Sequence, residues 1–174
     1  MNGRYLVALG GNVRHPRHGA PPRVLRATLD ALDGEPGIAV EAVSPIVTSA
    51  PLGPSRRRYA NAAAILASTL APPELLARLH AIELRFARRR RGRRWGARTL
   101  DLDIVLWSAG SWASPGLFVP HPAFRERNFV LGPALAIART WRDPLTCLTI
   151  AHLAARLRRP HPPAHPVDRH RPRA

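Results

Sequence analysis

The chain contains no lysine. All 27 of its basic residues are arginines, set against only 11 acidic residues in 174, and the formal net charge is +16 at pH 7. Missing lysine together with abundant alanine, arginine and proline indicates a compositional bias of the genome, so some arginines stand where lysine would serve equally well. The excess of positive charge predicts anionic partners.

Cysteine and long apolar runs are also scarce. The single cysteine, Cys147, cannot form an internal disulfide, so nothing indicates an oxidising compartment, and we expect this side chain to fill the core. The apolar run at residues 5–9 is too short for a signal peptide, and no segment approaches the roughly 20 apolar residues of a membrane span. The sequence therefore predicts a cytoplasmic protein that does not enter membranes.

The signatures of several enzyme classes are absent. The chain has no Gly-x-x-x-x-Gly-Lys-Ser/Thr loop, no Gly-x-Ser-x-Gly and no His-Glu-x-x-His. Gly10-Gly11-Asn12 follows an apolar run, but it is a turn signal rather than a dinucleotide fingerprint. These absences exclude P-loop enzymes and leave other phosphate chemistry open.

The positive charge is concentrated in three segments. These are residues 56–58, residues 85–98, with eight arginines and no acid, and the tail from residue 156, with six arginines and one aspartate. Because the rest of the chain is electrically neutral, a uniformly basic coat is excluded. From residue 160 the chain is rich in Pro, His and Arg and cannot build a core. We expect one domain over residues 1–159, and a disordered tail over residues 160–174 that is dispensable for chemistry.

Hydrophobic periodicity predicts an alternation of strands and helices. The expected elements are a strand at residues 5–9, a helix at 24–32, strands at 38–48 and 59–70, a helix at 72–86 and a strand at 99–107. This order is the split βαβ arrangement of ferredoxin-like α+β folds, with helices packed on an antiparallel sheet. A short segment at 117–119 and extra C-terminal helices at 129–138 and 148–157 follow.

Two aspartates carry the sharpest chemical signal. Side chains alternate along a strand, so Asp101 and Asp103 share one face while Leu102 points to the other. Two adjacent carboxylates repel each other, and a divalent cation removes that penalty. Oxygen ligands without nearby Cys or His favour Mg²⁺ over zinc. The alternative is an edge strand with two solvated aspartates, and the neighbouring arginine run favours the metal–phosphate site.

The arginine run at residues 88–94 supports more than one interpretation. It can clamp a polyphosphate, contact a nucleic acid, or simply form a solvent-exposed basic helix end that is stabilised by the helix dipole. Gly92 and Gly96 favour a mobile loop that closes over a substrate.

Two further groups of residues are candidates for ligand binding. His121, between two prolines, is followed by Arg125 and Arg127, which favours a phosphate or nucleotide contact, with a histidine in a surface turn as the alternative. Tyr59 and Asn61 share a strand face, so they could stack on and hydrogen-bond a flat heterocycle, or merely belong to a strand edge.

Taken together, these blocks resemble the 6-hydroxymethyl-7,8-dihydropterin pyrophosphokinase family of folate biosynthesis. The resemblance covers roughly residues 5–140 and is carried in family order by Leu9-Gly-Gly-Asn12, Thr48 to Pro54, Tyr59-Ala-Asn61, Ile82-Glu83-Leu84, Arg94-Trp95-Gly96, Arg98-Thr-Leu-Asp101-Leu-Asp103-Ile104, Pro120-His121-Pro122 and Arg125-Glu-Arg127-Asn-Phe129. It implies a ferredoxin-like kinase (EC 2.7.6.3) that transfers the terminal diphosphate of ATP to the hydroxymethyl group of the pterin, releasing AMP.

The resemblance also implies a role for individual residues. Two Mg²⁺ ions would be held by Asp101 and Asp103, which with Arg90 and Arg98 form the catalytic set. The pterin would be bound by Ser49, Leu52, Tyr59, Asn61, Trp95 and Phe129. ATP would be contacted by His80, Glu83, Arg88, Arg98, Ile104, His121 and Arg127. We expect a monomer whose partners are these small molecules, with no nucleic acid.

The chain departs from the family in several places. The family usually has serine where Gly11 stands and glutamine where His80 stands, and Gly116 replaces a basic nucleotide contact of some members. Two alternatives stay open: an RNA-binding module on the same scaffold, although no RNP-like aromatic string is found, and an inactive homologue that binds nucleotide only.

Overall fold

The structure is a computed structural model that describes residues 3–49, 57–86 and 98–159. Its elements are β1 (Gly3–Gly11), α1 (Pro21–Asp33), β2 (Ile38–Val43), β3 (Val47–Ser49), β4 (Tyr59–Ser68), α2 (Pro72–Arg85), β5 (Asp101–Trp107), β6 (Trp112–Ser114), β7 (Leu117–Val119), the 3₁₀ turn η1 (Phe124–Glu126), α3 (Asn128–Ile137) and α4 (Ile150–Arg158). The arginine run at 88–94, Leu52, Trp95 and the tail lie outside the described residues.

The central sheet has the strand order β2-β4-β1-β5, and all of its pairings are antiparallel. Strands β1 and β2, which are connected by α1, do not pair with each other, because β4 lies between them. This is the split βαβ order, so the predicted ferredoxin-like α+β fold is confirmed.

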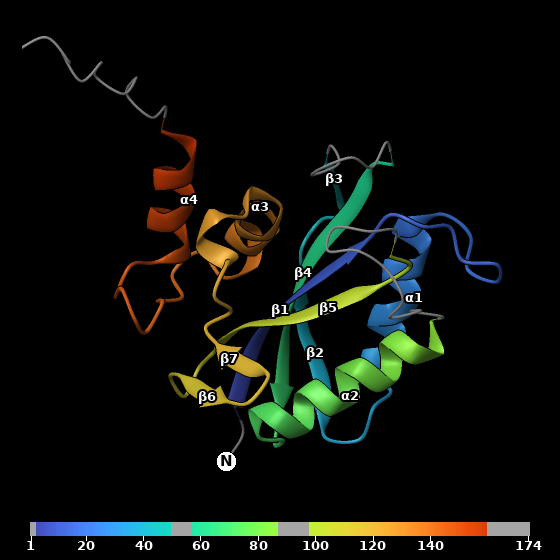
Figure 1. Cartoon of the computed structure of the whole chain (residues 1–174), viewed down its shortest axis with the longest axis horizontal. Helices are drawn as coiled ribbons and strands as arrows, with labels where there is room; N and C mark the ends of the chain where they lie inside the picture. The colour runs from blue at the N-terminus through green and yellow to red at the C-terminus, as the bar shows by residue number, and fades with distance from the viewer. Residues whose placement is uncertain (1–2, 50–56, 87–97, 160–174) are drawn as a thin grey trace, which may run out of the picture.

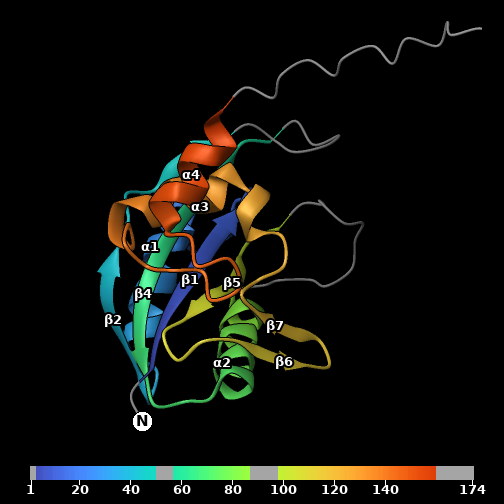
Figure 2. The ribbon, with the colours of Figure 1, turned by 90° about the vertical axis from the view of Figure 1, so that its left-hand side faces the viewer.

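The helices cover both faces of the sheet (Figures 1 and 2). Helices α1 and α2 pack on one face over a core that includes Val7, Leu25 and Leu79. Helix α3 packs on the other face over a second core that includes Leu6, Phe124 and Leu131, and α4 packs against α3 and η1 to complete this core. The helices present apolar side chains at helical spacing, which is why each can bury one side.

The strand predicted over residues 38–48 is two strands. β2 and β3 lie end to end along β4, with β2 opposite residues 64–68 and β3 opposite residues 59–61. Between them, Pro45 has no N–H for a ladder hydrogen bond. Ser44 compensates, because its hydroxyl accepts a hydrogen bond from the Ala63 N–H (2.9 Å) and its own N–H donates to the Ala63 carbonyl (2.9 Å).

Three other details correct the sequence expectations. Strand β5 begins at Asp101 rather than at residue 99, and the segment at 117–119 is the second strand of a hairpin with β6. Cys147 does not fill the core: it is exposed and has a φ of 59° in the connection between α3 and α4. The prediction for Cys147 was therefore wrong, because the residue serves a tight turn rather than packing. None of the helices among the described residues is long and apolar enough to cross a membrane.

Candidate active site

A pocket of about 210 Å³ opens on the α3 side of the sheet, at the end of the strands where α3 begins. It is lined by residues from five elements and the loops between them: Ala8, Leu9, Gly10, Ser49, Tyr59, Asn61, Arg98, Asp101, Asp103, His121, Arg127, Phe129 and Val130. Nine of these were predicted from the sequence as site residues, although they come from segments far apart in the chain.

The strand register explains why the predicted polar residues meet. In the central strand β1, Gly10 lies opposite Asp101 of β5 on one side and Asn61 of β4 on the other. Ala8 lies opposite Asp103. Because β1 contributes only the small residues Ala8 and Gly10 to this part of the face, the carboxylates and the carboxamide stand around an open space rather than around a packed side chain.

The two carboxylates lie beside positive charge. Arg98 makes an ion pair with Asp101, and the Arg127 Nη1 atom lies 3.8 Å from the Asp103 Oδ2 atom. Burial raises the pKa of the Asp103 carboxyl above its usual range and the charge of Asp101 raises it further, while His121, Arg127 and Arg98 act in the opposite direction. The two carboxylates thus concentrate negative charge in the pocket, and the two arginines partly balance it.

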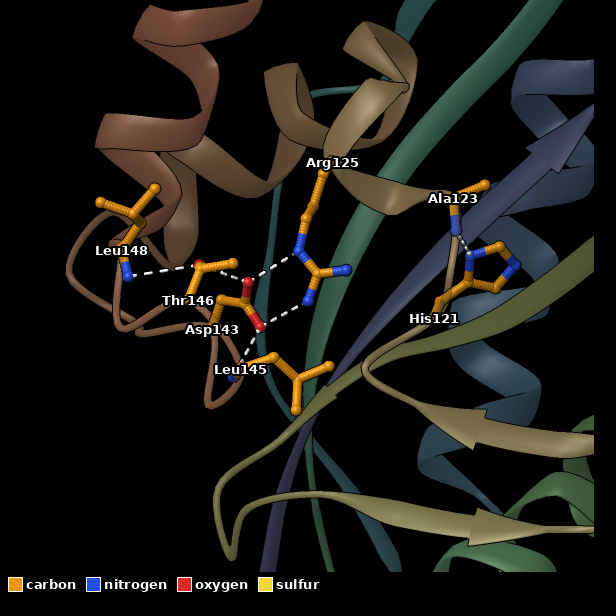
Figure 3. Close-up of polar contacts among 7 residues, drawn as sticks. All are labelled: His121, Ala123, Arg125, Asp143, Leu145, Thr146 and Leu148. Atoms are coloured by element: carbon orange, nitrogen blue, oxygen red, sulfur yellow. Dashed lines mark hydrogen bonds and ion pairs between the residues drawn. The ribbon is translucent and has the colours of Figure 1, made fainter.

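His121 is oriented by its own turn. Its Nδ1 atom accepts a hydrogen bond from the Ala123 N–H at 3.1 Å (Figure 3). Its backbone N–H donates to the Val105 carbonyl at 3.0 Å. In the neutral ring the proton therefore sits on Nε2. Burial lowers the pKa of His121, although Asp103 acts against this shift. The neutral ring can donate a hydrogen bond to a phosphate oxygen without carrying a charge.

The other end of the pocket is aromatic and amide-lined. Asn61 is almost fully buried and its side-chain amide donates to the Ser49 hydroxyl at 2.9 Å. Tyr59 and Phe129 line the same pocket, and the Arg127 guanidinium carbon lies 5.7 Å from the centre of the Phe129 ring. Burial raises the pKa of the Tyr59 hydroxyl, so it stays neutral at physiological pH. Flat rings and fixed amide groups suit a planar, polar-edged heterocycle.

A family model described as 7,8-dihydro-6-hydroxymethylpterin-pyrophosphokinase (HPPK) matches residues 6–139. The chain belongs to this family. The matched segment contains every described residue that lines the pocket.

Three proteins named as this pyrophosphokinase are similar to this chain over most of their length. The 2-amino-4-hydroxy-6-hydroxymethyldihydropteridine pyrophosphokinase of Pseudomonas aeruginosa is 44% identical over 142 residues, 81% of this chain and 84% of that protein. The enzyme of the same name from Synechocystis is 38% identical over 148 residues, 85% of this chain and 73% of that protein. The one from Bacillus subtilis is 35% identical over 140 residues, 80% of each chain.

A solved structure of Plasmodium falciparum HPPK-DHPS with pteroate is similar with a TM-score of 0.67 at 10% sequence identity. The similarity covers 90% of this chain and 42% of that protein, so the chain spans less than half of it. At this identity the likeness shows the fold alone.

Three residues that the HPPK resemblance assigns to ATP do not line the described pocket. Glu83 is fully buried on α2, and its Oε1 atom accepts a hydrogen bond from the Leu102 N–H at 2.8 Å. This placement gives Glu83 a structural role, because it satisfies a backbone donor of β5. Ile104 is also buried, and His80 is half-buried on α2. Their nucleotide contacts stay predictions. The ATP contact of Arg88, the catalytic role of Arg90 and the pterin contacts of Leu52 and Trp95 also stay predictions, because these residues lie outside the described ones.

The sequence predictions missed four pocket residues and one neighbour. Ala8, Leu9, Gly10 and Val130 line the pocket, and period-2 alternation along β1 would have placed Ala8 and Gly10 on its face. Gly11 is also required here, since a Cβ atom at this position would lie 2.4 Å from the Thr99 carbonyl oxygen. The glycine that departs from the family pattern thus lets the end of β1 approach the Arg98–Thr99 backbone.

Within the described residues no group of three or more His, Cys, Asp or Glu side chains could hold a metal ion. Asp101 and Asp103 are a pair of carboxylates on one pocket wall; the described pocket residues include no cysteine and one imidazole, His121, which the fold brings near Asp103 although it is distant in sequence. Such a pair fits a hard cation that takes its remaining ligands from phosphate oxygens and water.

Proposed function

We propose that this pocket binds 6-hydroxymethyl-7,8-dihydropterin at its aromatic end and the polyphosphate of ATP at its charged end. Membership of the HPPK family assigns the reaction, which is pyrophosphoryl transfer from ATP to the hydroxymethyl group in folate biosynthesis. One observation carries the assignment of the site: two aspartates, two arginines and a histidine share a single pocket with Tyr59, Asn61 and Phe129.

The aromatic end supplies recognition of the pterin. Tyr59 and Phe129 offer ring faces, and Asn61 presents a carboxamide whose orientation is held by Ser49. A buried amide in a fixed orientation discriminates strongly against a ligand that cannot complete its hydrogen bonds. Leu52 and Trp95, which lie outside the described residues, would add contacts to the pterin.

The charged end supplies positioning for transfer. The hydroxyl oxygen of the pterin forms a bond to the β-phosphorus, the bond from this phosphorus to the oxygen shared with the α-phosphate breaks, and AMP leaves. The hydroxyl proton departs in the same step, and Asp101 and Asp103 supply carboxylate acceptors. Arg98, Arg127 and His121 hold the phosphate oxygens, and Arg90 would join them from the loop.

Magnesium fits this site. Asp101 and Asp103 would hold two Mg²⁺ ions at the carboxylate pair, consistent with their oxygen ligands and with the repulsion between them. When bound, the ions neutralise charge on the polyphosphate and polarise its oxygens. The adjacent arginines would then balance the negative charge that remains on the phosphate oxygens.

The RNA-binding alternative is not favoured. Such modules bind RNA on an open sheet face with exposed aromatic residues. In this chain α3 covers that face, with α4 packed against α3, and the face opposite is covered by α1 and α2 (Figure 2). The cytoplasmic location, the monomeric state and the two-part division at residue 159 stay predictions.

Release of AMP is the deciding experiment. Purified protein is incubated with ATP, Mg²⁺ and 6-hydroxymethyl-7,8-dihydropterin, and AMP and the pterin diphosphate are quantified together. We expect both products in equal amounts and neither when the pterin or Mg²⁺ is omitted. Binding of ATP without AMP formation would instead identify an inactive homologue.

A further inference from the structure

The connection between α3 and α4 reaches back to the turn that carries His121 and Arg127. Asp143, in this connection, is fully buried, and its carboxylate accepts two hydrogen bonds from Arg125, one from Nε and one from Nη2, both at 2.7 Å (Figure 3). Arg125 lies in η1, between the two pocket residues. The pair therefore joins the site segment to a part of the chain that does not line the pocket.

Asp143 is held from several sides. Besides Arg125, the Thr146 hydroxyl donates to it at 2.5 Å and the Leu145 N–H at 3.1 Å. Burial alone would raise the pKa of the Asp143 carboxyl, but the hydrogen bonds from Arg125, Thr146 and Leu145 lower it below its usual range. The carboxylate is thus a fixed, charged anchor rather than a mobile surface acid.

The segment from His121 to Arg127 can transmit the position of this anchor. The Phe124 N–H donates to the His121 carbonyl at 3.2 Å, and the Arg127 N–H donates to the Phe124 carbonyl at 3.2 Å. The Arg127 carbonyl then accepts from Val130 and Leu131, which begins α3. A shift of Arg125 would move this hydrogen-bonded turn, and with it the Arg127 side chain in the pocket.

Packing on the same turn leaves Arg125 little freedom. Its guanidinium carbon lies 4.8 Å from the centre of the Phe124 ring, and Phe124 is buried in the second core. In Figure 3 Arg125 points toward Asp143, whereas His121 lies apart from this pair, over the sheet. The two arginines of the turn thus have different tasks, since Arg127 lines the pocket and Arg125 faces Asp143.

We propose that Asp143 and Arg125 are positioning residues for the polyphosphate of ATP: their buried ion pair sets the place of Arg127 and His121 without contacting the substrates. This inference rests on the proposed function for the identity of the ligand at the charged end. It predicts that loss of the pair weakens nucleotide binding much more than pterin binding. Phe129 follows Arg127 at the start of α3, but Tyr59 and Asn61 belong to β4, on the sheet, which the pair does not contact.

The test compares ligand binding in Asp143→Asn, Arg125→Lys and wild-type protein. The first substitution keeps the size of the side chain without its charge, and the second keeps the charge without the two-nitrogen fork. The probes are an ATP analogue with a methylene group between the α- and β-phosphates, titrated with Mg²⁺, and separately the dihydropterin. Arg142→Ala is the matched control, because Arg142 binds the Cys147 carbonyl in the same connection at 2.9 Å and does not reach η1.

We expect the dissociation constant of the ATP analogue to rise about five- to tenfold in both variants, with the dihydropterin constant within about twofold of wild type. Circular dichroism at the assay temperature establishes whether each variant is folded. If Asp143→Asn does not fold, the binding constants of Arg125→Lys decide the outcome. Unchanged nucleotide binding, or equal losses for both ligands, would overturn the proposal. AMP release by the wild type is scored separately, so an inactive wild type would refute the proposed function and leave the binding comparison intact.

Discussion

Asn12 and Arg98 are bound to each other through reciprocal hydrogen bonds. The Arg98 N–H donates to the Asn12 side-chain oxygen at 2.8 Å, and the Asn12 N–H donates to the Arg98 carbonyl at 2.8 Å. Asn12 is almost fully buried at the end of β1. This contact fixes the backbone from which Arg98 reaches Asp101, and it gives a role to a motif that the sequence presented only as a turn.

Replacement of Asn12 by alanine should impair catalysis more than folding. The Arg98 N–H loses its acceptor, which costs about 1–3 kcal/mol of unfolding free energy. Displacement of Arg98 should lower kcat by about tenfold to a hundredfold. Steady-state kinetics and urea denaturation measure the two effects. Ser108→Ala is the control, since the Ser108 hydroxyl accepts from the Arg4 N–H outside the pocket; a wild-type kcat for Asn12→Ala would refute the role.

Replacement of Asp101 by asparagine should remove most of the activity. The variant keeps the shape of the side chain but loses the charge that pairs with Arg98 and would hold Mg²⁺. We expect turnover to fall by about a hundredfold or more, with a higher Mg²⁺ concentration needed for half-maximal rate. AMP release over a Mg²⁺ titration is the measurement. Asp30→Asn, on the exposed side of α1, should behave as wild type, and an active Asp101→Asn would remove this residue from the metal site.

Replacement of Tyr59 by alanine should separate the two substrates. Loss of one stacking face costs about 0.5–1.5 kcal/mol, so the KM for the dihydropterin should rise by about threefold to tenfold. The KM for ATP should stay unchanged, because Tyr59 belongs to the aromatic end of the pocket. Tyr59→Phe, which keeps the ring, should retain near-normal binding of the pterin. Equal rises in both KM values for Tyr59→Ala would contradict this division of the pocket.

Tyr5 should make stability sensitive to alkaline pH. Its buried hydroxyl donates to the Leu70 carbonyl at 2.7 Å, and burial, followed by the charge of Glu74, raises the pKa of Tyr5 to about 12. In the unfolded chain the pKa is about 10. The stabilising contribution of the protonated hydroxyl is therefore fully present below about pH 10 and is lost as pH rises toward about 12.

Tyr5→Phe tests this prediction by denaturation. The variant should lose about 1 kcal/mol at neutral pH, and its stability should fall less steeply than that of the wild type between about pH 10 and about pH 12. Turnover at neutral pH should be unchanged, because Tyr5 packs in the first core and does not line the pocket. Parallel stability curves for the two proteins would refute the assignment.

Local pattern alone determined the order of strands and helices and the shared face of Asp101 and Asp103, because side-chain periodicity follows from backbone geometry. The same alternation placed Tyr59 with Asn61. The break at Pro45 was missed because it depends on how β2 and β3 pair with β4. The β6–β7 hairpin was missed because strands of three residues carry too little alternation, and the turn at Cys147 because cysteine is not a residue typical of positive φ.

The tertiary structure decided which of the chemically suitable residues meet. Burial of Glu83 under β5 depends on how α2 packs on the sheet, and the place of Asp143 behind Arg125 depends on how the α3–α4 connection packs against η1. A carboxylate in a sequence can be a ligand, an anchor or a solvated surface group, and the pattern around it is similar in each case. The sequence by itself predicted the reaction class through the motifs that resemble the family, whereas burial and hydrogen-bond partners distinguished residues that face the pocket from those that support it.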